Sequence, residues 1–169
     1  MERYQIGQKV LYGSHGVCVI VDREERIVDR KPVVYYVLEP SGQVRSRFLV
    51  PAHNVAAMGK LRPVLSREEL DSLIHMDAIR SGTWVPQENL RKQIYRELIS
   101  SGDRLRILQM LHTIYRHKEE QAAAGKRVHL CDENFLREGE KLLASEISLV
   151  LELSAEEAKQ YLREKLREE

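Results

Sequence analysis

Hydrophobic residues in the first third of the chain fall into short runs that are rich in β-branched and aromatic side chains. The runs occupy residues 9–12, 17–21, 33–38 and 44–50, with turn-forming residues between them at 13–16, 29–32 and 40–42. Such runs, bounded by Gly, Pro, Asp and Ser, are typical of strands. Four or five short strands in this length predict a small β-barrel of the SH3 or Tudor type, whose sheet keeps open edges.

From Leu65 onward, the apolar residues recur at the three- and four-residue spacing of amphipathic helices. The first predicted helix begins at a capping box formed by Ser66 and Glu69 and ends at Ser81–Gly82. Four more helices follow, with boundary signals at Pro86, Gly102, Asp103, Ala124–Gly125, Asp132 and Ser154–Glu157. The predicted fold class is therefore α+β, with a β-barrel domain over residues 1–62 and an all-helical domain over residues 63–169.

The overall composition is that of a globular protein. Hydrophobic residues make up 43% of the chain and charged residues 31%. No apolar run approaches the roughly 20 residues that cross a bilayer, and residues 1–10 lack the apolar segment of a signal peptide. The two cysteines, Cys18 and Cys131, need no disulfide in a reducing compartment. We therefore expect a cytoplasmic protein.

Charge is distributed unevenly, although the formal net charge is only +1. Residues 78–118 carry eight basic and three acidic side chains, whereas residues 119–169 carry eight basic and thirteen acidic ones. A basic segment beside an acidic one indicates a local anion-binding face. The alternative is an ordinary solvated helix surface, because charged side chains line solvent in most proteins.

The residues that could support catalysis or metal binding form no recognisable pattern. Six histidines and two cysteines match no paired metal-ligand spacing. His112 and His117 are five residues apart, which places them on different faces of a helix, and His129 with Cys131 supplies only two ligands. No glycine-rich loop follows a strand and opens a helix, as phosphate binding would require. We expect neither enzymatic activity nor a metal or cofactor.

Trp84 is the single tryptophan of the chain, and it lies in a helix-breaking segment flanked by arginines. One interpretation is that the indole packs at the junction between two helices, as buried aromatic residues do. The other is that it projects as an apolar plate from a basic rim. Apolar side chains of that kind insert at DNA base steps while neighbouring cations hold the phosphates. The two interpretations differ in the exposure of the indole.

Residues 6–16, IGQKVLYGSHG, resemble the opening of the CarD/CdnL family of bacterial transcription regulators. The similarity continues through residues 35–38, 50–54 and 59–62. In the helical half, it includes a tryptophan after the first helix, the Ser-Gly-Asp at residues 101–103, and the helix around residues 140–146. The resemblance thus extends over nearly the whole chain.

This resemblance implies a non-enzymatic regulator with two binding functions. The Tudor-like domain would bind the RNA polymerase β subunit by adding strand to strand. The helical domain would contact promoter DNA at the upstream edge of the transcription bubble, where Trp84 would enter the minor groove and stabilise the open complex. Contacts to phosphates would be largely independent of sequence. The protein would then associate with the nucleoid through polymerase, and its oligomeric state stays open.

The resemblance also assigns individual residues. Arg26 matches a polymerase-contacting arginine, and a second such position corresponds to Arg47 or Leu49 near the end of the last strand. On the DNA side, the candidate phosphate contacts around Trp84 are Arg80, Arg91, Lys92 and Arg96. The alternative is a protein-only interaction module, in which the β domain binds polymerase or another partner and the helices contact no DNA.

Overall fold

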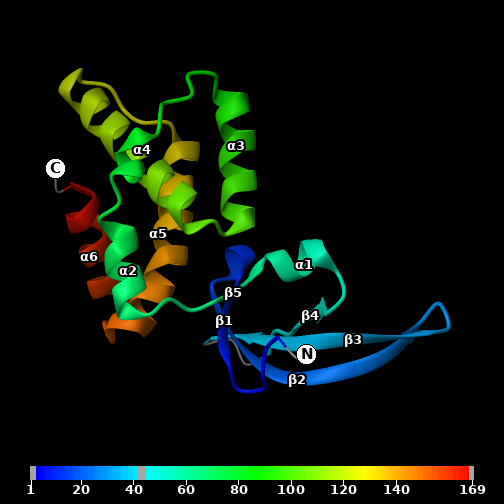
Figure 1. Cartoon of the computed structure of the whole chain (residues 1–169). Coiled ribbons are helices and arrows are strands. Elements are labelled where there is room, and N and C mark those ends of the chain that lie inside the picture. The colour runs from blue at the N-terminus through cyan, green and yellow to red at the C-terminus, as the bar shows by residue number, and fades with distance from the viewer. Residues whose placement is uncertain (1–2, 42–44, 168–169) are drawn as a thin grey trace. The chain divides into compact units, whose positions relative to one another are not determined.

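The computed structural model describes residues 3–41 and 45–167, and it confirms the α+β class. The chain divides into two compact units, residues 1–64 and 65–169 (Figure 1). The boundary expected at residue 62 falls inside the last strand, so the first unit extends to Val64. Each unit is described by itself below.

The first unit is built on a five-stranded antiparallel sheet with the strand order β4-β3-β2-β1-β5. Its elements are β1 (Lys9–Tyr12), a 3-10 turn (Gly13–His15), β2 (Val17–Val28), β3 (Lys31–Pro40), β4 (Phe48–Pro51), helix α1 (Val55–Gly59) and β5 (Leu61–Pro63). In this order β4 and β5 are the edge strands. The last predicted strand begins at Phe48 rather than at Val44, and Gly42 and Val44 lie outside the described residues.

Strands β2 and β3 form a hairpin much longer than the hydrophobic runs predict (Figure 1). Only Asp29 and Arg30 form its turn, with φ angles of 50° and 64°, as two-residue hairpin connections require. Lys31 and Pro32, expected in the turn, already pair with β2. The outer part of β2 carries exposed polar residues, and Ile27 is 70% exposed. Because that part has no buried face, the sequence lacks the alternation by which strands are recognised.

The core of the first unit lies between the sheet and α1. It contains Val10, Ile20, Leu38, Val50, Met58 and Leu61, all 7% exposed or less. The hydroxyl of Tyr4 donates to the carbonyl of Leu61 at 3.0 Å and ties the N-terminal segment to β5. Helix α1 begins at Asn54, whose side chain accepts from the Ala57 amide at 3.0 Å. The sequence did not predict α1 or β5, because both are too short to show a period.

All regular elements in the described part of the second unit are helices. They are α2 (Arg67–Ile74), a 3-10 turn (Asp77–Ser81), α3 (Glu88–Ser101), α4 (Arg104–Ala123), α5 (Leu130–Leu151) and α6 (Ala155–Arg167). Helix α4 supplies the centre of the core, where Ile107, Leu111 and Ile114 are fully buried. Both halves of the capping box at Ser66 and Glu69 are present, and Gly102 ends α3 with a φ of 70°. Local boundary signals at these positions are therefore confirmed.

Three other helix boundaries predicted from the sequence were wrong. Helix α2 ends at Ile74, and the turn that follows it is a separate 3-10 element that reaches Ser81. Helix α3 begins at Glu88, two residues after Pro86. Helix α5 begins at Leu130 with His129 as its N-cap, and Asp132 lies inside the helix, fully buried. The carboxylate of Asp132 binds an arginine of another helix instead of capping its own.

Candidate functional site

Trp84 lies in the segment between the 3-10 turn and α3, half-buried against the helical core. The imidazole of His117, from α4, stacks on its indole with 3.5 Å between ring centroids and 9° between planes. The guanidinium carbon of Arg91 lies 4.3 Å from the indole centroid, a cation–π contact. The indole is neither fully buried nor freely exposed, which combines features of both interpretations of the sequence.

Arg91 holds the segment around Trp84 in place. Its Nε and Nη2 donate to the two carboxylate oxygens of Asp132 at 2.8 and 2.9 Å, the two-pronged geometry that arginine and carboxylates favour. Its Nη1 donates to the backbone carbonyl of Val85 at 3.0 Å, next to Trp84. A single side chain of α3 thus joins α5 to the loop that carries the indole.

In the structure, the guanidinium of Arg91, which the sequence suggested as a phosphate contact, is occupied by contacts within the protein. The side chain is only 2% exposed, and its hydrogen-bond donors are directed at Asp132 and at the backbone before α3. Moving it to a phosphate would leave the buried Asp132 carboxylate without its counter-ion, which is costly. Sequence reasoning could not find this pair, because its members are 41 residues apart.

The other three expected cations are accessible to different degrees. Arg96 is exposed on α3. Lys92, one turn before it on the same helix face, is 30% exposed in its side chain and pairs with Glu88 at 3.1 Å. Arg80 lies half-buried at the end of the 3-10 turn.

Another basic residue of the segment, Arg104, is partly withdrawn from the surface, because it forms a two-pronged ion pair with Glu146 at 2.7 and 2.8 Å. The basic excess of residues 78–118 is therefore smaller on the surface than in the sequence.

A pocket of about 130 Å³ opens beside the indole and brings in residues that sequence analysis did not select. Trp84, Arg91 and His117 form part of its wall, and Gln121, Arg127 and His129 complete it with Pro86. Burial lowers the pKa of His117, which keeps its imidazole neutral near pH 7. Arg127 and His129 come from the α4–α5 connection, and only the fold places them near Trp84.

The polymerase-side candidates lie in two places on the first unit. Leu49 is 38% exposed on the edge strand β4, and Arg47, just before that strand, pairs with Glu39 at 3.0 Å. Arg26 lies on the hairpin arm opposite Val33 and pairs with Glu24 at 2.9 Å. Leu49 is opposite Val37, so the two positions are separated by about 13 Å along the sheet.

The backbone of β4 offers an edge for strand addition. The Ala52 amide donates to the Val34 carbonyl at 2.9 Å, and hydrogen-bonding residues alternate along an antiparallel pair. The amide and carbonyl of Leu49 therefore point away from β3. Pro51 lacks an amide hydrogen, so Leu49 is the β4 residue through which a second strand can both donate and accept.

Other kinds of site find little support in the described residues. Across residues 3–41 and 45–167, no three His, Cys, Asp or Glu side chains gather in a way that could hold a metal ion. No helix in that part of the chain is long and apolar enough to cross a membrane. Cys18 is buried, and burial raises the pKa of its thiol to about 11, which suppresses the reactive thiolate.

Comparison with known families accounts for both units. Residues 4–65 match the model of the CarD-like/TRCF RID domain, and residues 76–163 match the model of the CarD C-terminal domain. No curated protein matches the chain closely enough to serve as a named relative. Domains of this family indicate a transcription regulator that interacts with RNA polymerase. The two matches follow each other in the order of the two units, and the chain belongs to the CarD/CdnL family.

Proposed function

We propose that this protein binds the β subunit of RNA polymerase through its first unit, a Tudor-like domain, and stabilises the promoter open complex through its second. The observation that supports the DNA half most strongly is the half-exposed indole of Trp84, held between α3 and α4 by Arg91 and His117. A rigid apolar plate with cations nearby is suited to a partly unstacked base step. The mechanism requires no catalysis.

The polymerase contact uses the edge of β4. A strand of the β subunit pairs with the outward amide and carbonyl of Leu49, and side chains around it give selectivity. Arg47 and the Leu49 side chain contact the same strand, whereas Arg26 on the hairpin arm contacts a more distant part of the subunit. The affinity for polymerase places the second unit near the upstream edge of the bubble.

At the DNA, we assign the residues roles that differ in part from those expected from the sequence. Trp84 enters the minor groove at the upstream edge of the bubble, and Arg80, Lys92 and Arg96 contact phosphates with little dependence on sequence. Arg91 positions the indole rather than binding phosphate, because its guanidinium is hydrogen-bonded to the carboxylate of Asp132. Arg127, beside the indole, is an additional candidate for a phosphate contact.

The energetic requirement is modest. A protein that binds the melted promoter more tightly than the closed one shifts the equilibrium by the difference in affinity. A preference of about 1.4 kcal/mol changes the ratio of open to closed complexes tenfold. One inserted indole and a few phosphate contacts are enough for a difference of this size.

A second candidate is a protein-only module whose helices contact another polypeptide. It is favoured by the stacking of His117 on the indole, which covers a surface that a base would need. The two candidates are separated by placing 2-aminopurine at the upstream edge of a promoter bubble. We expect wild type to raise its fluorescence at equilibrium and Trp84→Ala to leave it unchanged, although both bind polymerase. Equal signals from both proteins would favour the protein-only module.

A further inference from the structure

Gly82 lies two residues before Trp84, directly after the 3-10 turn, and packs against α4. Its backbone angles, φ −65° and ψ 143°, are open to any residue, so the conformation of the chain does not call for a glycine. The available space does, because a Cβ at Gly82 would lie 2.5 Å from Oγ1 of Thr113 and 3.3 Å from the carbonyl oxygen of Gln109. Glycine therefore permits a close approach of the Trp84 segment to the helix.

Thr113 is held in place on its own helix. Its hydroxyl donates to the carbonyl of Gln109, one turn earlier, at 2.7 Å, and the residue is only 7% exposed. Branching at Cβ leaves such a side chain few rotamers within a helix. A methyl group on Gly82 would therefore push the segment away from α4 by roughly 1 Å before ordinary contact distances return.

The same face of α4 holds the segment at two further points. Gln109, Thr113 and His117 are spaced by four residues, so they lie one above another along the helix. Before Gly82, the Nε2 of Gln109 donates to the carbonyl of Ala78 at 2.8 Å. After Gly82, the imidazole of His117 stacks on the indole. The close approach to Thr113 is thus the middle one of three contacts between the segment and α4.

The contact at Gly82 and the stack on the indole are mechanically linked, because only Thr83 separates Gly82 from Trp84. Rings with 3.5 Å between their centroids are in van der Waals contact. A gap of roughly 0.5–1 Å between such surfaces already forfeits a quarter to a half of their attraction. A displaced backbone at Gly82 is therefore expected to separate the indole from His117.

We propose that Gly82 is a positioning residue for Trp84. The absence of a side chain at Gly82 lets the segment rest on Thr113, and this close approach fixes the indole in the position from which it contacts melted promoter DNA. The inference rests on the proposed function for the identity of that contact, whereas the positioning itself is a property of the free protein. Gly82 acts through Trp84 and contacts neither DNA nor polymerase.

The first test is the tryptophan fluorescence of the full-length protein without DNA, because Trp84 is the only tryptophan. We expect Gly82→Ala to shift the emission maximum to longer wavelength, since the indole leaves its stack and becomes more exposed. Adding Thr113→Ala removes the atom that the new methyl group meets and should reverse the shift. Adding Thr113→Val instead keeps a branched side chain of similar shape and should leave the shift in place. If Gly82→Ala loses its helical circular dichroism, recovery of the fold by Thr113→Ala tests the same contact.

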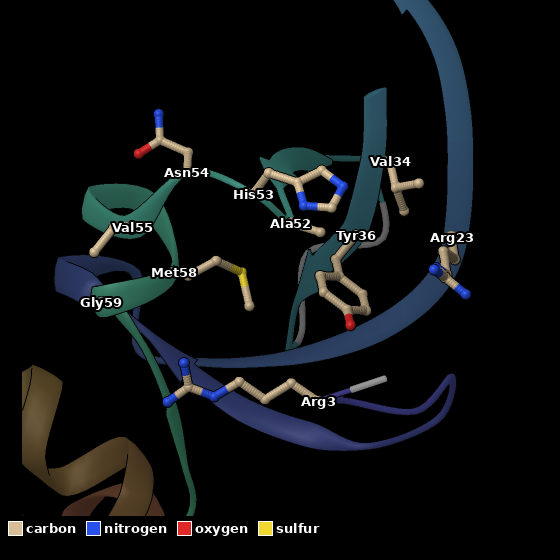
Figure 2. Close-up of a pocket in the computed structure, with 10 residues that line it drawn as sticks. All are labelled: Arg3, Arg23, Val34, Tyr36, Ala52, His53, Asn54, Val55, Met58 and Gly59. Atoms are coloured by element: carbon tan, nitrogen blue, oxygen red, sulfur yellow. The ribbon is translucent and has the colours of Figure 1, made fainter. Parts of the chain in front are cut away.

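Gly59→Ala is the matched control. Gly59 is the last residue of α1 and borders a pocket of about 550 Å³ in the first unit (Figure 2). A Cβ at this position meets no atom within 4 Å. We expect Gly59→Ala to keep both the wild-type emission maximum and the wild-type effect on the promoter. The comparison separates the close approach at Gly82 from the general effect of replacing a glycine.

The second test is the lifetime of a promoter open complex after a competitor challenge. Gly82→Ala should bind RNA polymerase core enzyme as wild type does. We expect it to lose most of the prolongation, so that the lifetime falls to within about twofold of that without the protein, because a displaced indole no longer favours the melted state. Adding Thr113→Ala should restore the prolongation, whereas adding Thr113→Val should not.

The outcomes separate the inference from the proposed function. A wild-type emission maximum in Gly82→Ala, or a shift that Thr113→Ala does not reverse, would overturn the inference and leave the proposed function intact. A displaced indole with an undiminished open-complex lifetime would overturn it as well, because the position set by Gly82 would then be unimportant at the promoter. If wild type itself fails to prolong the lifetime, the proposed function is refuted, and the emission maxima still decide whether Gly82 positions Trp84.

Discussion

The imidazole of His117 stacks on the indole of Trp84 with 3.5 Å between ring centroids. Because Trp84 is the only tryptophan in the chain, this contact makes intrinsic fluorescence a direct report on the candidate DNA-binding residue. A protonated imidazole at this distance quenches indole emission, whereas a neutral one does so far less. The relationship therefore connects an optical signal to one defined side-chain pair.

We expect the tryptophan emission to fall as the solution is acidified. Burial lowers the pKa of His117 from its ordinary value of 6.5, so the midpoint of the emission change should lie below pH 6.5. His117→Phe keeps a stacked ring but cannot be protonated, and it should remove the titration. A titration of the same size in His117→Phe would show that another group quenches the indole.

The stability of the second unit should also decrease in acid. Burial lowers the pKa of both His112 and His117, and the charges of Arg80 and Arg116 lower that of His112 further. A lowered folded-state pKa means that the stabilisation is present above pH 6.5 and is lost as the pH falls through the folded value. We expect a lower Tm at pH 5 than at pH 7.5, and a smaller difference in the double variant with glutamine at both histidines. An unchanged difference would assign the acid sensitivity to other groups.

The ion pair of Arg91 and Asp132 should be the most sensitive polar contact of the second unit. Both side chains are buried, at 2% and 0% exposure, and removal of one partner leaves an uncompensated charge. Arg91→Ala is expected to lower the free energy of unfolding by about 3–5 kcal/mol, as measured by urea denaturation. Lys92→Ala, on the next position of the helix, should change it by less than about 0.5 kcal/mol. Similar effects for the two variants would contradict the structural role of Arg91.

Arg91→Met with Asp132→Leu tests whether the pair stabilises the fold or sets the position of Trp84. Replacement of a buried ion pair by apolar residues is often neutral for stability. We therefore expect the double variant to unfold near the wild-type urea concentration, but with a shifted tryptophan emission maximum, because the cation–π contact is lost. If the emission maximum stays at the wild-type wavelength, Arg91 does not position the indole.

The edge of β4 should be essential for binding polymerase. Leu49→Pro removes the one β4 amide that faces outward, without removing a bond to β3. We expect at least a tenfold weaker dissociation constant for polymerase core enzyme, measured by fluorescence anisotropy, with an unchanged circular dichroism spectrum. Arg26→Ala should weaken binding less, because its side chain already pairs with Glu24 at the surface. Wild-type affinity in Leu49→Pro would exclude strand addition at this edge.

Sequence reasoning succeeded where the signal is local. The capping box at Ser66, the stop at Gly102 and the N-cap at Asp103 each depend on residues within one turn of the chain, and all three are present. The two family matches likewise confirm the membership that short motifs along the chain indicated. Local chemistry and motif order are properties that a single sequence carries.

Sequence reasoning failed where the role of a residue depends on a tertiary contact. Asp132 is of a residue type that often forms an N-cap, but its ion pair with Arg91, 41 residues away, places it inside the helix and buries it. Arg91 looks like a surface cation of an amphipathic helix, and that same ion pair withdraws it from solvent. The sequence singles out His117 and Trp84 separately, yet nothing in their spacing indicates that their rings stack. Pairings of this kind depend on the packing of α3, α4 and α5, which no local pattern encodes.

The central claim is that Trp84 stabilises melted promoter DNA while the first unit holds polymerase. The most direct measurement is the lifetime of a promoter open complex after a competitor challenge, with wild type and with Trp84→Ala. The account predicts that wild type prolongs the lifetime and that Trp84→Ala loses the effect at unchanged affinity for polymerase. If both proteins bind polymerase and prolong the lifetime equally, or if neither changes it, the proposed role of the indole is contradicted.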